Sequence, residues 1–206
     1  MVNEKCMLVT NGNLIIIKNN KMNYLVYDTE TNGFPPHARM TQLAFILFNE
    51  EGEVLMQEQD FIKPEGWTIP KTEFFINNGM TTERNMELGI PLKQSLEKFH
   101  LALERAHYKI AHNHNFDVQI VTNEIAKVGM PLQPFATKKH FCTMLSSIDY
   151  VGAVNKWGKP GKWPNLQELH KKCFNEEFEG AHDALADVKA TVRCFLHLKE
   201  KGVIKI

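Results

Sequence analysis

The apolar and polar residues in the first half of the chain follow the pattern of a strand meander. A β-rich run at residues 24–27 ends at Asp28, and a nearly continuous apolar run follows at residues 41–48. A polar turn at residues 49–52 separates that run from a third one at residues 54–62. Because apolar runs bounded by turn residues are typical of strands, we expect three consecutive strands here.

The second half of the chain has helical periodicity. After Pro91, apolar residues recur at steps of three and four, which predicts an amphipathic helix. Short apolar runs at residues 108–111 and 140–143 predict strands on either side of a helix at about residues 118–128. A last apolar stripe predicts a helix over residues 182–199. This order of elements indicates an α/β fold with a mixed sheet.

Two segments depart from these regular patterns. Residues 63–91 are rich in Gly, Pro and Asn, so we expect a long surface segment with one short helix near residues 74–76. Near the N-terminus, apolar runs flank Asn11-Gly12, which is a strong signal for a β-hairpin. We therefore expect residues 1–21 to form an N-terminal hairpin or leader, and residues 22–206 to form one domain.

Composition narrows the class of protein. Lys plus Arg equals Asp plus Glu at 24 each, which argues against a tight, non-specific binder of nucleic acid. The four cysteines lie far apart, as expected for reduced thiols in a cytoplasmic protein. The apolar runs are shorter than a membrane span, and no signal peptide is recognisable. We expect a cytoplasmic protein that does not associate with a membrane.

The first candidate site is the pair of acids in Asp28-Thr29-Glu30, at the predicted end of the first strand. Residues i and i+2 of a strand point to the same face, so Asp28 and Glu30 would project together. Divalent cations such as Mg²⁺ prefer carboxylate oxygens of this kind. On its own, the pair also fits a solvated turn after a strand.

Two further candidate sites lie at the starts of predicted helices. His112-Asn113-His114-Asn115-Phe116-Asp117 joins a strand to a helix; Asn113 or Asn115 could cap that helix, and Asp117 would lie in its first turn. His182-Asp183-Ala184-Leu185-Ala186-Asp187 opens the last helix, where His182 could face the same pocket as Asp187. We expect Asp183 only to complement the positive end of the helix.

These motifs in this order resemble the DEDD superfamily of 3′→5′ exonucleases, over about residues 22–200. The His-x-x-x-x-Asp spacing resembles its DEDDh branch. The nearest likeness is to the proofreading subunits of bacterial replicative DNA polymerases and to their stand-alone relatives. The resemblance implies a ribonuclease-H-like fold with a five-stranded mixed sheet flanked by helices. It also implies two divalent ions, Mg²⁺ or Mn²⁺, and a general base, His182. The implied metal ligands are Asp28, Glu30, Asp117 and Asp187.

Further residues are candidates for binding the substrate. In the family, the stretch after the first motif lines the pocket for the terminal nucleotide, which suggests Thr29, Thr31 and Phe34, although Phe34 fits loop packing equally well. Asn113 is a candidate from the second motif. Residues 150–167 lack acids, and their lysines and tryptophans are typical of a contact surface for a single strand or of a packed loop. The candidates there are Lys156, Trp157, Lys159 and Lys162.

The resemblance implies hydrolysis from the 3′ end of single-stranded or frayed DNA, releasing nucleoside 5′-monophosphates. An exoribonuclease would use the same catalytic residues, and a catalytically silent module that binds nucleic acid or polymerase is the alternative from another class. A DNA polymerase partner stays open. Family members often carry His-Gly-Ile/Leu-Thr before the first long helix, whereas residues 78–81 here read Asn-Gly-Met-Thr.

Overall fold

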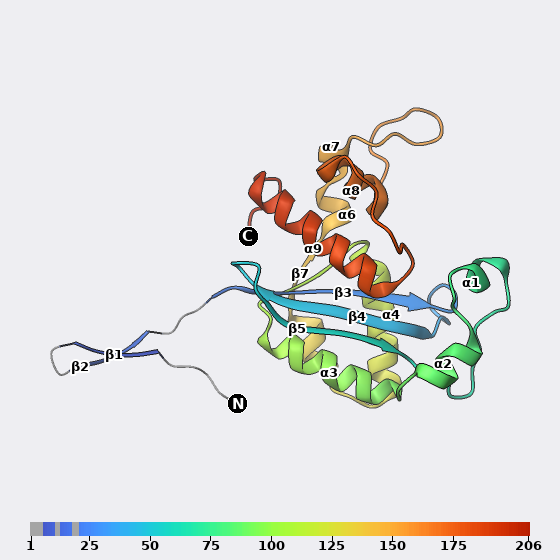
Figure 1. Ribbon diagram of the computed structural model, residues 1–206, viewed down its shortest axis with the longest axis horizontal. Helices are drawn as coiled ribbons and strands as arrows, with labels where there is room; N and C mark the ends of the chain where they lie inside the picture. Colours follow the sequence, from blue (N-terminus) through green and yellow to red (C-terminus); the bar gives the residue numbers. More distant parts are fainter. Residues whose placement is uncertain (1–5, 11–12, 18–20) are drawn as a thin grey trace.

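The computed structural model describes residues 6–10, 13–17 and 21–206. Its main sheet has five strands in the order β5-β4-β3-β6-β7 (Figure 1). The strands are β3 (Asn23–Thr31), β4 (Met40–Asn49), β5 (Val54–Phe61), β6 (Tyr108–Ala111) and β7 (Lys139–Cys142). β4 is antiparallel to β3 and β5, whereas β6 is parallel to β3 and β7. The predicted mixed sheet of an α/β fold is confirmed.

The central strand β3 continues beyond the point where the sequence predicted its end. Asp28 pairs with Ala44 and Glu30 with Gln42, before the register shifts between Glu30 and Thr31. Both acids therefore lie within the strand, and not in a turn after it. The polar residues remain in the strand because the long neighbour β4 offers backbone partners along its whole length.

Helices cover both faces of the sheet (Figure 1). The helices on one face are α3 (Leu92–Arg105), α4 (His114–Lys127) and α5 (Gln133–Thr137). Those on the other face are α6 (Thr143–Ser146), α7 (Ile148–Val151), α8 (Leu166–Phe174) and α9 (Ala184–Glu200). None of the helices in the described part of the chain is long and apolar enough to cross a membrane.

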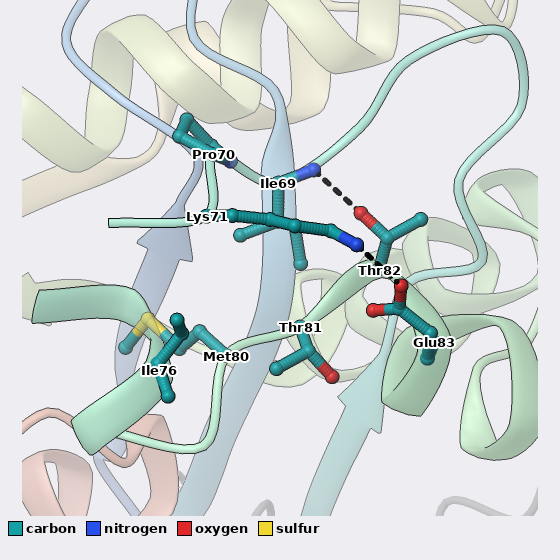
Figure 2. A pocket seen from close by; sticks show the side chains of 8 residues that line it. All are labelled: Ile69, Pro70, Lys71, Ile76, Met80, Thr81, Thr82 and Glu83. Carbon is teal, nitrogen blue, oxygen red and sulfur yellow. Dashed lines mark hydrogen bonds and ion pairs between the residues drawn. The ribbon is translucent and has the colours of Figure 1, made fainter. Parts of the chain in front are cut away.

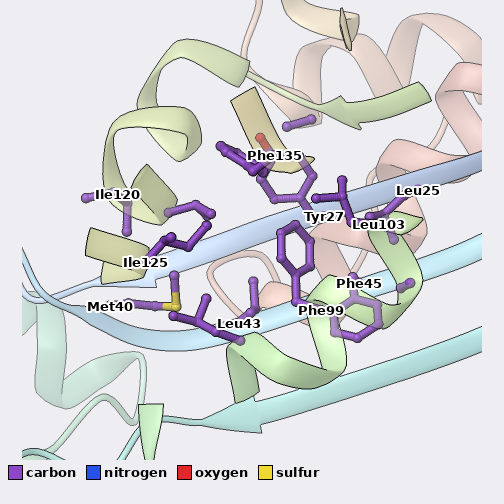
Figure 3. Close-up of a cluster of buried hydrophobic side chains, with 14 of the residues drawn as sticks. Leu25, Tyr27, Met40, Leu43, Phe45, Phe99, Leu103, Ile120, Ile125 and Phe135 are labelled. Atoms are coloured by element: carbon purple, nitrogen blue, oxygen red, sulfur yellow. The ribbon is translucent and has the colours of Figure 1, made fainter. Parts of the chain in front are cut away.

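Two hydrophobic cores hold these layers together. The face under α3 and α4 buries Leu25 and Tyr27 of β3 with Phe99 and Phe135 (Figure 3). The face under α9 buries Tyr24 and Val26 with residues of α8 and α9. Successive residues of β3 thus point into opposite cores, and the same alternation continues into Asp28, Thr29 and Glu30.

Several boundaries differ from the sequence predictions. Residues 63–91 contain two helices, α1 (Glu73–Asn77) and α2 (Thr82–Leu88), where one was predicted. The second is capped by the Thr81 side chain, which accepts a hydrogen bond from the Arg84 N–H. Helix α4 begins at His114, directly after Asn113, one of the two predicted cap positions. Helix α9 begins at Ala184, so His182 precedes the helix that it was predicted to open.

The N-terminal strands β1 (Cys6–Thr10) and β2 (Asn13–Ile17) pair antiparallel in a sheet of their own. The predicted Asn11-Gly12 turn lies outside the described residues. The division into residues 1–21 and a domain at 22–206 stays a prediction.

Candidate active site

Three acidic side chains meet where β3 passes under the start of α9. Asp28, Glu30 and Asp187 each offer a carboxylate oxygen, and these oxygens all lie within 4.8 Å of one another. Asp28 and Glu30 share a face because side chains alternate along a strand, and α9 packs on that face. Two elements far apart in the sequence thus bring three negative charges together.

This acidic group fits a hard divalent cation. Its donors are carboxylate oxygens, the ligands that Mg²⁺ and Mn²⁺ prefer. Asp187 Oδ1 is buried and has no hydrogen-bond partner among the described residues, which is costly for a carboxylate oxygen unless a cation offsets its charge. Asp28, Glu30 and Asp187 are therefore the residues that would hold a metal ion.

Asp117 reaches the site from the other face of the sheet. It lies in the first turn of α4, as predicted, and is only 2% exposed. Its Oδ1 accepts hydrogen bonds from the Thr29 N–H at 3.0 Å and the Thr29 hydroxyl at 2.8 Å. Asp117 is thus hydrogen-bonded to Thr29, the strand residue between Asp28 and Glu30. It stands beside the group of three carboxylates and not within it.

Burial and mutual repulsion shift the acids' proton affinities. Burial, followed by the charges of Asp187 and Asp117, raises the pKa of Glu30 to about 8. Burial also raises the pKa values of Asp117 and Asp187 to about 7, despite hydrogen bonds that favour their charged forms. The pKa of Asp28 rises well above its usual value for the same reasons, burial first. A divalent cation would relieve this repulsion and keep the group ionised.

His182 lies two residues before α9 on a left-handed backbone, with φ of 71°. Its side chain is exposed, and its ring packs edge-on against Phe74 of α1, with 5.4 Å between ring centroids. The ring contributes no ligand to the group formed by Asp28, Glu30 and Asp187. The structure therefore places His182 at the rim of the site, where its ring packs against Phe74 of α1.

Asp183 makes more contacts than the helix-end charge role that the sequence predicted. It caps α9, because its Oδ1 accepts a hydrogen bond from the Ala186 N–H at 3.1 Å. Its Oδ2 accepts from the side-chain amides of Gln42 at 3.2 Å and Gln59 at 2.7 Å. The Gln42 oxygen in turn accepts from the Ala184 N–H at 3.1 Å. Two glutamines of β4 and β5 thus fasten the start of α9, and with it His182 and Asp187, to the sheet.

The candidate residues after the first motif lie in different settings. The Thr29 hydroxyl is committed to Asp117, and the Thr31 hydroxyl donates to the Gly33 carbonyl at 2.7 Å. Phe34 is 84% exposed and touches Phe116 only at its edge, with 6.4 Å between centroids. Such exposure does not fit packing within the loop, and contact of Phe34 with a ligand stays a prediction.

The predicted capping of α4 by an asparagine is wrong. Asn113 occupies the N-cap position but has φ of 66° and makes no side-chain cap bond, and Asn115 lies inside the helix. The left-handed backbone turns the Asn113 side chain away from the direction that a capping side chain needs. Its amide is therefore not engaged in holding α4.

The loop before α8 contains the basic and aromatic candidates. Trp157 is 73% exposed, and the Lys156 ammonium lies 4.4 Å from its ring centroid. Lys162 forms an ion pair with Glu168, so its charge is already offset. The base of the loop is tied to the end of β6, since His112 Nε2 hydrogen-bonds the Pro164 carbonyl at 3.0 Å. Lys159 contributes its backbone N–H to the Asn155 side chain.

The segment between β5 and α3 forms a hollow beside the site. It encloses about 280 Å³ and is lined by Ile69, Ile76, Met80 and polar residues of α2 (Figure 2). The Ile69 N–H donates to the Thr82 hydroxyl, and Lys71 pairs with Glu83 across its mouth. Met80 belongs to the Asn-Gly-Met-Thr stretch that differs from the family pattern. It also lines a smaller hollow that reaches His182 and Asp183. This segment thus lies beside His182 and Asp183, next to the start of α9.

The fold and the acidic site define a class of nuclease, and comparison with known proteins names its family. A family model described as exonuclease (RNase_T) matches residues 25–195. The chain belongs to this exonuclease family, which confirms the predicted superfamily. The narrower likeness to polymerase proofreading subunits stays a prediction.

The individual proteins that the chain resembles share only low sequence identity with it. The chain is 25% identical over 188 residues to the 3′-5′ exonuclease DinG of Bacillus subtilis (strain 168), a match that covers 88% of the chain and 18% of that protein. E. coli exonuclease I in complex with a dT13 oligonucleotide superposes with a TM-score of 0.72 at 22% identity, over 86% of this chain and 41% of that one. A zinc-bound complex of E. coli exonuclease I with single-stranded DNA gives 0.70 at 23% identity, over 88% and 41% of the two chains.

The chain therefore spans less than half the length of these relatives. The structural likenesses confirm the ribonuclease-H-like exonuclease fold.

Stability should depend on pH through the acidic group. Because the pKa values of Glu30, Asp117 and Asp187 lie above the ~4 of an unfolded chain, the folded state binds more protons between pH ~4 and ~8. Stability in chelator should therefore fall as the pH rises through this window, and Mn²⁺ should remove most of the fall. Thermal unfolding of wild type and Asp187→Asn measures this. A melting temperature that is independent of pH in chelator, or an unchanged slope in the variant, would contradict it.

The glutamine contacts at Asp183 predict a second effect. Gln59→Glu places a carboxylate against Asp183 and should lower the free energy of unfolding by about 1.5–3 kcal/mol, the range for hydrogen bonds to charged groups. Adding Asp183→Asn restores a donor and acceptor pair and should recover part of the loss, as a double-mutant cycle in denaturant would show. Gln57→Glu makes the same change at an exposed position of β5 and serves as the control. Equal stability of both single variants would rule out the contact.

Proposed function

We propose that this chain is a metal-dependent 3′→5′ exonuclease that hydrolyses DNA from its 3′ end and releases nucleoside 5′-monophosphates. The observation that carries the proposal is the group formed by Asp28, Glu30 and Asp187, whose oxygens lie within 4.8 Å of one another. Membership of the exonuclease family and the fold shared with exonuclease I support it. DNA is favoured as substrate because that structural neighbour is bound to single-stranded DNA.

The acidic residues would bind two divalent ions, Mg²⁺ or Mn²⁺. Asp28, Glu30 and Asp187 would supply ligands, and Asp117 would supply its second oxygen, since its Oδ1 is held by Thr29. Ions at such a site offset the phosphate's negative charge and lower the pKa of water. The protein holds the four carboxylates close together despite their repulsion. The two hydrophobic cores and the hydrogen bonds at Asp183 keep the elements that carry them in place.

His182 is proposed as the general base. A neutral imidazole has a free ring nitrogen that can accept the proton of the attacking water. Its place at the rim of the site, two residues before α9, suits a group that meets solvent and substrate. The contact with Phe74 orients the ring, and the Asp183 contacts fix the chain that carries it.

Other residues are proposed to bind the strand. Thr29 is buried and bonded to Asp117, so it would act on the strand only through that acid. Thr31 would contact the strand with its backbone, Phe34 would stack on or wedge beside a base, and Asn113 would offer its amide near Asp117. Aromatic side chains bind single strands because every base has a face that can stack. In the loop before α8, Lys156, Trp157 and Lys159 would contact the strand further out, and Lys162 would support the loop through Glu168.

The direct test is digestion of 5′-labelled single-stranded DNA and a matched RNA, resolved on a gel, with Mg²⁺, Mn²⁺ or chelator. We expect a ladder that shortens from the 3′ end of DNA only with metal, and faster cleavage of DNA than of RNA. Asp28→Ala is the control and should lose cleavage.

Faster cleavage of RNA would change the substrate to RNA. No cleavage of either polymer would leave a module that binds nucleic acid or a polymerase. A polymerase partner and a cytoplasmic location stay predictions.

A further inference from the structure

A basic pocket lies on the α3 and α4 side of the sheet, away from the acidic group. It encloses about 270 Å³ between the end of β5, the start of α3 and the end of α4. Its charged lining comprises Arg39, Lys63, Lys93 and Lys127, with Glu65 as the one acid among the lining residues. We call this hollow the basic pocket.

The positive charge of the basic pocket is largely uncompensated. Arg39 is bound by Glu124 through two hydrogen bonds, so that pair is neutral. Lys63, Lys93 and Lys127 are exposed, and none forms an ion pair within the described residues 21–206. Three lysines against Glu65 leave an excess of two positive charges here, whereas the whole chain has a formal charge of zero.

The first turn of α3 adds to this field. The helix begins at Leu92, which lines the pocket, and its first turn contains no acidic residue. The positive end of its dipole is therefore not offset locally. An anion that enters the pocket would meet both the helix end and the three ammonium groups.

The basic pocket is connected directly to the catalytic strand. Arg39 precedes β4, whose Met40 pairs with Thr31 of β3, and the Arg39 N–H donates to the Asn32 side chain at 2.7 Å. Helix α4 carries Asp117 in its first turn and Lys127 in its last. At 1.5 Å per residue these two positions are about 15 Å apart along the helix, roughly the length of four nucleotides in a stacked strand.

The chemistry of the pocket suits phosphates better than bases. Its one aromatic residue, Trp67, already has the Arg39 guanidinium 5.2 Å from its ring centroid. Exposed lysines bind phosphate as point charges without reading the base. A ligand here would be held by its backbone, independently of sequence and with strong dependence on salt.

We propose that the basic pocket binds the phosphate backbone of the nucleic-acid strand a few nucleotides upstream of the scissile bond. This inference rests on the proposed exonuclease function and adds to it an extended binding path. Long substrates would be held by the catalytic site and by Lys63, Lys93 and Lys127 together, whereas a single nucleotide ester reaches only the catalytic site.

The test compares two substrates in the full-length chain. One is a long single-stranded oligonucleotide, and the other is thymidine 5′-(p-nitrophenyl) phosphate, which has no upstream phosphates. The triple variant Lys63→Gln, Lys93→Gln, Lys127→Gln should raise KM for the oligonucleotide by about tenfold and flatten its dependence on log salt by about 2 units, at ~0.7 per phosphate contact. Its kinetics on the nitrophenyl ester should equal those of wild type.

The matched control is Lys172→Gln, Lys201→Gln, Lys205→Gln, which removes the same charge from exposed positions near the ends of α8 and α9. Equal KM values for the oligonucleotide in the two triple variants would overturn the proposal. So would an equal loss on both substrates, which would place the effect in the catalytic site or in folding. If wild type cleaves neither substrate, the proposed function itself fails, an outcome distinct from these.

Discussion

Electrostatic repulsion among carboxylates is the constraint on which this structure depends. Asp28, Glu30 and Asp187 bring oxygens within 4.8 Å of one another, with Asp117 beside them. Burial makes the repulsion stronger than it would be in water, as the raised pKa values of these acids indicate. A fold that holds such a group pays in stability for a site that favours divalent cations.

Several parts of the fold hold these charged groups in place. Strand β3 lies in the middle of the sheet, with one core on each face, so its carboxylates cannot move apart without disturbing both cores. Thr29 fixes Asp117 on one face, and Gln42 and Gln59 fix Asp183, and thereby the start of α9, on the other. Each acid is thus restrained by a neighbouring hydrogen bond or strand, and none of them forms an ion pair within the part of the chain that the structure describes.

Local patterns predicted much of this arrangement. The alternation of side chains along a strand predicted that Asp28 and Glu30 share one face. The apolar run at residues 108–111, followed by a helical pattern, predicted that Asp117 lies in the first turn of a helix. The extension of β3 through Thr31 was missed because it depends on pairing with β4. The contacts of Gln42 and Gln59 with Asp183 join residues 141 and 124 positions apart, and no local signal indicates them. Nor does sequence spacing reveal the left-handed backbone at His182 or its contact with Phe74.

We propose that the carboxylates bind metal, whereas His182 accepts the proton of the attacking water without holding the ion. Titration of Mn²⁺ into wild type, His182→Ala and Asp187→Asn, with turnover of an oligonucleotide measured on the same samples, tests this most directly. We expect His182→Ala to keep wild-type Mn²⁺ affinity but lose most turnover, and Asp187→Asn to lose both. Wild-type turnover in His182→Ala, or unchanged Mn²⁺ affinity in Asp187→Asn, would contradict it.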